Sequence, residues 1–199
     1  MVPPPAPRAH TVRSADEYER RLRSAMSLVA GQTRDAVAKE IRGGIDAQVA
    51  AAGGDFARVA PTLDDPTWVG AQMRGVYGVA PWFKALVAVA GALLGLTSVP
   101  GVFTGPADGG LAVVVALLSF VTLMALLWVA MGASRPAAAL AGIAAAAARA
   151  VGFVLPQGGI TPLEAATGGE AALFFIATVL IVVVAVVPLL VLRGRGEDA

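Results

Sequence analysis

The sequence predicts an all-α integral membrane protein in which a small cytoplasmic helical module precedes a four-helix transmembrane bundle. Four apolar segments lie in the last six-tenths of the chain, and each approaches or exceeds the roughly 18–20 residues that cross a bilayer as a helix. The composition is 57% hydrophobic and only 15% charged, with a mean hydropathy of +0.73. Ten of the 15 lysines and arginines lie before residue 81, so the charge is concentrated ahead of the apolar segments.

The residue types present argue against several classes of function. The net charge is +1, and the early cations are interleaved with nine carboxylates, so a nucleic-acid partner is not expected. The absence of cysteine excludes disulfides and thiolate chemistry. The single histidine, His10, lies in a proline-rich lead, and no phosphate-binding glycine motif follows a strand. We therefore expect no enzymatic activity, no cofactor and no metal.

The first residues are expected to form a lead without fixed structure. Residues 1–13 contain four prolines, which favour an extended, solvated chain. No apolar signal-peptide core is present there, so the first membrane helix is expected to direct insertion. Order begins at Ser14, because Ser14 and Glu17 have the spacing of a capping box. The first helix is expected to end at Gly31.

Residues 14–80 are expected to form the cytoplasmic module. A second helix at about residues 33–51 carries Gly43–Gly44, which costs about 2 kcal/mol against alanine and predicts close packing or a kink. After a short third helix, Asp65 and Pro66 predict the N-cap and first residue of a closing helix. Apolar spacing of three and four residues predicts the module core: Tyr18, Leu22, Met26, Val37, Ile41, Ile45, Leu63, Val69 and Met73.

Three segments of the module occur in the order of a known family: EYERRLRSAMSLV, RDAVAKEIRGGIDAQV and FARVAPTLDDPTWVGAQM. Over about residues 15–77 the module resembles the HAAS signalling domain, a family that overlaps with the permease prefix domains. The matching residues are Tyr18, Leu22, Glu40, Ile41, Leu63, Pro66 and Ala71. The turn after the first helix lacks the family's usual proline, and Asp64 stands where a glycine is common. The resemblance implies a cytoplasmic helical module fused to membrane segments.

The membrane region is expected over residues 81–192, with helices at about residues 82–99, 110–131, 137–155 and 171–192, and a cytoplasmic tail over residues 193–199. Cations fall on alternate connections. Lys84 precedes the first helix, Arg135 lies between the second and third, and Arg193 follows the fourth. The excess of cations in cytoplasmic loops therefore predicts a multi-pass protein of the cell membrane, with both termini in the cytoplasm.

The four predicted membrane helices differ in character. The helix at residues 137–155 is mostly alanine and is expected to pack against its neighbours, because small side chains allow close backbone approach. The second and fourth are richer in large apolar residues and are expected to face lipid. In the first, Gly91 and Gly95 have a spacing that can seat another helix, either within the bundle or from a second copy of the chain.

Arg149 is a candidate intramembrane charge. A cation near mid-bilayer costs about 2.5–3.5 kcal/mol on insertion scales and is a functional candidate for that reason. However, Arg149 lies about 9 Å from the expected helix end at Leu155, given a rise of 1.5 Å per residue. Its guanidinium is therefore expected either to snorkel to the outer side and pair with Glu164 or Glu170, or to serve a transport or ligand-binding role.

The sequence thus predicts a non-enzymatic, membrane-anchored signalling or docking protein. Its expected partners are the lipid bilayer and either a protein partner of the module or another copy in a homo-oligomer. The alternative is a small membrane subunit of a transporter or export complex, or an oligomeric channel. Neutralising Arg149 separates these two hypotheses, because only transport would depend on the charge.

Overall fold

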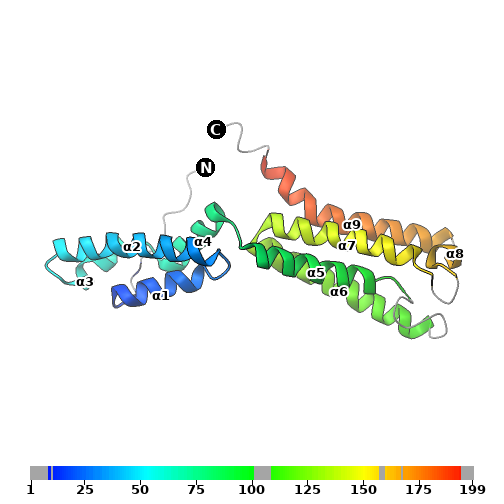
Figure 1. The fold of residues 1–199 in the computed structure, drawn as a ribbon, viewed down its shortest axis with the longest axis horizontal. Coiled ribbons are helices and arrows are strands. Elements are labelled where there is room, and N and C mark those ends of the chain that lie inside the picture. The colour runs from blue at the N-terminus through cyan, green and yellow to red at the C-terminus, as the bar shows by residue number, and fades with distance from the viewer. Residues whose placement is uncertain (1–8, 10, 101–108, 157–159, 167, 194–199) are drawn as a thin grey trace. The chain divides into compact units, whose positions relative to one another are not determined.

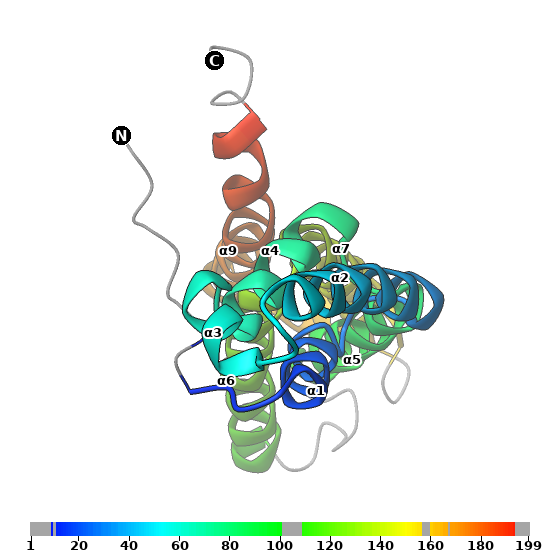
Figure 2. The same ribbon diagram turned by 90° about the vertical axis from the view of Figure 1, so that its left-hand side faces the viewer.

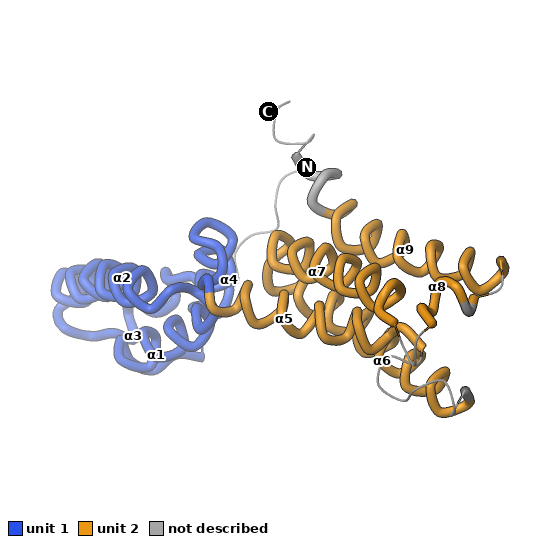
Figure 3. Tube along the Cα trace, turned by 45° about the vertical axis from the view of Figure 1, so that its right-hand side comes forward, with its two compact units in different colours: residues 1–81 blue, residues 82–199 orange. Residues whose placement is uncertain are grey.

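The structure is a computed structural model, and every regular element in the part of the chain that it describes is helical (Figure 1). It describes residues 9, 11–100, 109–156, 160–166 and 168–193. The chain divides into two compact units, which Figure 3 distinguishes by colour. Unit 1 is Met1–Pro81 and unit 2 is Trp82–Ala199. The tail residues 194–199 lie outside the described residues.

Unit 1 is built from short helices around α1. Its elements are α1 (Ala15–Ala25), α2 (Gly31–Ala51), α3 (Phe56–Val59), a 3₁₀ turn (Ala60–Thr62) and α4 (Pro66–Tyr77). Helix α1 packs against both α2 and α4, and the two views of the ribbon show α1 beside them (Figure 1 and Figure 2). Because α1 contacts both longer helices, its apolar face is the centre of the core.

The start of α1 follows the predicted capping pattern in part. The Ser14 hydroxyl accepts a hydrogen bond from the Glu17 amide at 3.2 Å, as expected. The Glu17 carboxylate accepts from the amide of Arg13 at 2.9 Å, one residue before the cap. This hydrogen bond, followed by the nearby arginines, lowers the pKa of the Glu17 carboxyl. The helix therefore begins where predicted, but the Glu17 carboxylate bonds the amide of Arg13 instead of the amide of the N-cap residue Ser14.

The predicted end of the first helix is wrong. Helix α1 ends at Ala25, and Gly31 is the first residue of α2 instead of the last of α1. The chain turns between them because Met26 and Val29 are both buried in the core, and the Val29 amide bonds the Met26 carbonyl at 2.9 Å. Of the two alternatives predicted for Gly43–Gly44, close packing is absent, since a Cβ added to either glycine would meet no atom within 4 Å. The kink stays a prediction.

All nine residues predicted for the module core lie in one apolar cluster. Buried members are Tyr18, Leu22, Met26, Val37 and Ile45, and partly buried members packed on them are Ile41, Leu63, Val69 and Met73. The Tyr18 hydroxyl donates to the Asp64 carbonyl at 2.9 Å. Burial, with the charges of Asp64 and Asp65, raises the pKa of Tyr18 to about 12.

The ordered core of unit 1 begins before Ser14. Ala9 and Val12 are buried in the same cluster, and the Ala9 amide bonds the Leu63 carbonyl at 3.0 Å. The expectation of a lead without fixed structure over residues 1–13 is therefore wrong at these positions, because the two small apolar side chains fill the core beside α1. Residues 1–8 and 10 of that lead, including His10, lie outside the described residues.

Ion pairs connect the outer faces of α1 and α2. The Arg42 guanidinium contacts Asp16 at 2.5 Å and Glu19 at 3.3 Å, and Arg23 contacts Asp35 at 2.5 Å. Most of these side chains are partly exposed, so each pair contributes at most about 1 kcal/mol. The pairs orient the two helices, while the apolar cluster supplies most of the stability of the unit.

Asp65 caps α4 as the sequence predicts, and Pro66 is the first helical residue. The Asp65 carboxylate accepts from the Thr67 amide at 2.8 Å, from the Trp68 amide at 3.3 Å and from the Thr67 hydroxyl. The Thr67 hydroxyl bond is the main cause of the lowered pKa of Asp65. The ionised carboxylate is therefore the form that stabilises α4.

Replacing Asp65 is expected to change how the stability of unit 1 depends on pH. Asp65→Ala is expected to lower the free energy of unfolding of unit 1 by about 1 kcal/mol at neutral pH. Because the folded pKa is lowered, the ionic contribution is present above the unfolded pKa of about 4 and disappears as pH falls through the folded value. Urea unfolding of the full chain in mild detergent, followed by Trp68 fluorescence with the other two tryptophans replaced by phenylalanine, measures this difference. Asp65→Asn keeps a hydrogen-bond acceptor without the charge, so the free energy of unfolding of this variant should vary less at acid pH. A pH dependence equal to that of the unchanged protein would contradict the role of ionised Asp65 as the cap of α4.

Unit 2 consists mainly of apolar helices. They are α5 (Pro81–Thr97), α6 (Gly109–Ala133), α7 (Arg135–Val154), the short α8 (Pro162–Ala165) and α9 (Gly168–Arg193). Among the described residues, α6, α7 and α9 are each long and apolar enough to cross a membrane. A fourth span results only if α4 and α5 are counted together. Helix α5 alone has 17 residues, about 25 Å of helix, against a hydrocarbon core of roughly 30 Å.

Helix α7 lies at the centre of unit 2, which confirms the prediction for the alanine-rich segment. It packs against both α6 and α9. Its inner face is made of small residues, including Ala138, Ala141 and Ala145, all of them fully buried. In contrast, large apolar side chains on α6 and α9 are exposed, such as Trp128 at 77% and Leu173 at 67%. Exposed apolar surface of this extent suits contact with lipid.

Candidate functional site: a buried arginine among apolar helices

Arg149 is placed on the inner face of α7. It follows Ala145 by one helical turn, and its side chain is only 6% exposed. Apart from Ser98, no other polar or charged residue is buried to this degree in the described part of the chain. A guanidinium in such surroundings must be hydrogen-bonded to offset its lost hydration.

The Arg149 guanidinium is bonded to uncharged groups of two neighbouring segments. Its Nη1 donates to the Ser98 carbonyl oxygen at 2.7 Å and to the Ser98 hydroxyl, just after α5. Its Nε donates to the Thr178 hydroxyl on α9 at 3.2 Å. The guanidinium carbon also lies 4.8 Å from the centroid of the Phe174 ring, within the range of a cation–π contact. Arg149 thus joins α5, α7 and α9.

The predicted ion pair with Glu164 is wrong. The Glu164 carboxylate accepts from both the amide and the hydroxyl of Thr161, each at 2.9 Å, and so caps α8. These two hydrogen bonds lower the pKa of the Glu164 carboxyl. The local cap satisfies the carboxylate, whereas Arg149 is buried among α5, α7 and α9.

The hydroxyls that receive Arg149 are themselves oriented by backbone carbonyls. Ser98 donates to the Gly95 carbonyl at 2.7 Å, and Thr178 donates to the Phe174 carbonyl at 2.9 Å. Each hydroxyl therefore turns its lone pairs toward the guanidinium. The role of Ser98 was not predicted, because a serine at the end of an apolar helix carries no signal of its partner.

Gly91 and Gly95 lie against α7. A Cβ added at Gly91 would lie 2.6 Å from the Ala141 carbonyl oxygen, and one added at Gly95 would lie 2.7 Å from the Ala145 Cα. These are backbone atoms that cannot rotate away. The surface formed by the two glycines is therefore occupied by α7 and is not free to seat a second copy of the chain.

An aromatic cluster closes the same end of the helices. The rings of Phe153 and Phe174 are stacked with centroids 3.8 Å apart, and Val99 packs in the same buried group. Together with Arg149 and Ser98, these side chains connect the end of α5 to α7 and α9. The cluster is therefore suited to fixing helix positions.

The chemistry available at this site is limited. A guanidinium stays protonated, so it can donate hydrogen bonds or attract an anion but cannot act as a general base at neutral pH. Its Nη2 makes no hydrogen bond to a residue within the described ranges. Within those ranges no group of three acidic or histidine side chains is arranged to hold a metal ion.

In the part of the chain that the structure describes, fold and site together define an all-helical arrangement with three to four helices apolar enough to span a membrane, consistent with a membrane protein. Comparison with known proteins found no matching family model, no similar curated protein and no similar solved structure. The resemblance of unit 1 to the HAAS signalling domain therefore stays a prediction.

Proposed function

We propose that the chain is a non-enzymatic docking or signalling protein of the cell membrane, with both termini in the cytoplasm. In this proposal unit 2 anchors the chain, and unit 1 binds a protein partner or a second copy. The observation that carries it is the division of the chain into two units with different surfaces. Unit 1 has its own apolar core and an ion-paired exterior, whereas the helices of unit 2 expose large apolar side chains.

The hydrogen bonds of Arg149 also favour anchoring. Its Nη1 and Nε are used on Ser98 and Thr178, so the residue that most resembles a transport site acts as a connection between helices. The alternative, a small membrane subunit of a transporter or an oligomeric channel, draws support from the same buried cation, because intramembrane charges commonly mark ion pathways. Arg149 is therefore the residue on which the two functions differ.

The test compares three forms of the protein by crosslinking in native membranes, mild solubilisation and mass spectrometry. The forms are the full chain, a chain lacking residues 1–78, and the full chain with Arg149→Gln. Docking by unit 1 predicts that a defined partner is captured by the full chain and by Arg149→Gln at equal yield. The chain lacking residues 1–78 should lose that partner.

The opposite pattern would assign the function to the helices of unit 2. In that case the shortened chain retains the same transporter subunits or self-contacts, and Arg149→Gln loses them. Purified protein in liposomes then gives a second, independent readout. Solute flux that disappears on Arg149→Gln supports the transport alternative, whereas the docking proposal expects no flux from either form.

A further inference from the structure

Helix α4 exposes an uncharged face that differs from the rest of unit 1. Among the described residues of unit 1, the large apolar side chains that are exposed all lie on α4: Trp68, Val76 and Tyr77. Ala71, Gln72 and Gly75 are also exposed, and with Val76 they share one side of the helix with Trp68, at spacings of three, four, seven and eight residues from it. The outer faces of α1 and α2 carry ion pairs instead.

The position of α4 in the chain favours lipid as the occupant of this face. Only residues 78–80 separate the end of α4 from the first residue of the apolar helix α5. Trp68 and Tyr77 are residue types that favour the boundary between headgroups and hydrocarbon. An uncharged helix face that carries Trp68, immediately before a membrane-entering segment, matches the chemistry of an interfacial helix.

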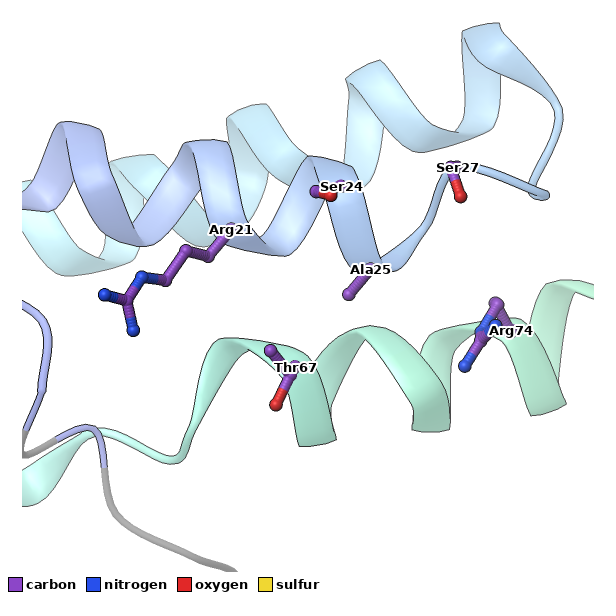
Figure 4. Close-up of a pocket in the computed structure, with 6 residues that line it drawn as sticks. All are labelled: Arg21, Ser24, Ala25, Ser27, Thr67 and Arg74. Atoms are coloured by element: carbon purple, nitrogen blue, oxygen red, sulfur yellow. The ribbon is translucent and has the colours of Figure 1, made fainter.

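A groove beside this face offers a site for the lipid phosphate. The groove lies between α1 and α4, has a volume of about 380 Å³ and is lined by Arg21, Ser24, Ala25, Ser27, Thr67 and Arg74 (Figure 4). Figure 4 shows Arg21 and Thr67 toward one end and Ser27 and Arg74 toward the other. The two helices come close because Gly70 faces Ala25, where an added Cβ would meet Ala25 atoms.

The two ends of the groove differ in available charge. Arg21 pairs with Glu17 at 2.6 Å, and the Thr67 hydroxyl donates to Asp65, so that end is already neutralised. No hydrogen bond or ion pair with a described residue involves the Arg74 guanidinium, and no carboxylate lines the groove. Arg74 also complements the negative end of the α4 dipole, but that interaction leaves its five N–H donors available.

We propose that α4 lies in the headgroup layer of an anionic bilayer. The face formed by Trp68, Ala71, Gln72, Gly75 and Val76 contacts lipid, and Arg74 with the exposed Ser24 and Ser27 hydroxyls receives a headgroup phosphate. The proposal does not depend on docking of a protein partner by unit 1. It depends on membrane insertion of the chain and on the surface of α4.

The test uses Trp68 as the probe in the full chain, with Trp82→Phe and Trp128→Phe removing the other two tryptophans. The protein is placed in bilayers containing lipids brominated near the headgroup end of the acyl chain. Trp68 fluorescence should be quenched by these lipids, and more strongly with phosphatidylserine than with phosphatidylcholine alone. Arg74→Gln should reduce the bound-to-free ratio of α4 about fivefold in the anionic bilayer, the change expected for one interfacial cation.

The matched control moves the probe to α2. Gln48 is exposed on α2, so Gln48→Trp in a Trp68→Phe background should be quenched by aqueous acrylamide and not by brominated lipid. Trp68 behaving like this control would overturn the proposal. Shielding of Trp68 from both quenchers would also overturn it and assign the face to a protein. If inorganic phosphate changes Trp68 fluorescence in phosphatidylcholine bilayers and phosphatidylserine has no effect on it, the groove is a site for soluble phosphate instead.

Discussion

Replacing Gly95 by leucine is expected to separate α5 from α7 and to lower the stability of unit 2 by about 3 kcal/mol. Even the first added carbon would lie 2.7 Å from the Ala145 Cα, and the obstacle is backbone, which cannot adopt another rotamer. The helices must therefore move apart, and the close approach on which membrane helices depend is lost. Unfolding of the full chain in mixed micelles with increasing dodecyl sulfate, followed by circular dichroism, measures the loss.

Gly132 provides the matched control on α6. It is exposed, and a Cβ added there would meet no atom within 4 Å. Gly132→Leu should therefore leave the stability unchanged or raise it, by no more than the roughly 1 kcal/mol helix-propensity gain over glycine. Equal stability of the two variants would refute the packing of α5 on α7. If Gly95→Leu instead abolished a dimer without affecting unfolding, the glycines would belong to an interface between copies.

Truncating Leu22 is expected to produce the largest effect in unit 1. Its side chain is 0% exposed and lies on α1, in the cluster that joins α1 to α2 and α4. Leu→Ala changes at such sites cost about 2–5 kcal/mol through lost burial and the cavity left behind. A unit of this size buries a smaller fraction of its surface than a large domain does, so the loss is a substantial part of its stability.

Hydrogen exchange in the full chain can measure this change unit by unit. Leu22→Ala should reduce the protection of the most slowly exchanging amides of α1, α2 and α4 by roughly 30-fold to several thousand-fold. Amides of unit 2 should keep their protection, because the core cluster contains residues of unit 1 alone. Gln48→Ala, at an exposed position, is expected to change protection by about twofold or less. Loss of protection in both units would show that they unfold together.

Local chemistry made several helix limits predictable. The Asp65–Pro66 pair identified the start of α4, because a carboxylate accepts the free amides and proline has none to leave unpaired. The nine core positions were predicted from helical spacing, which places every third or fourth side chain on one face. The end of α1 was missed, because it depends on the burial of Met26 and Val29 in the turn that follows the helix.

The candidate site likewise has a part that was predictable from local sequence and a part that was not. Arg149 was singled out because a cation in an apolar segment is costly wherever that segment lies. Its partners were not predictable, since Ser98 and Thr178 are 51 and 29 residues away in the chain and each is a common residue type. The neighbouring Glu164 was the simpler electrostatic partner, but it is held by Thr161 as a local cap.

The sequence by itself determined that this chain is helical, that its later helices are apolar enough for a membrane, and that nine named residues belong to the core of unit 1. Hydrophobic periodicity, segment length and capping are local properties, so they can be read without coordinates. Only the tertiary structure decided that Gly91 and Gly95 face α7, that Arg149 bonds Ser98 and Thr178, and that α4 leaves Trp68 and Val76 exposed. These features depend on which helix faces meet, and that choice is made by packing between distant segments.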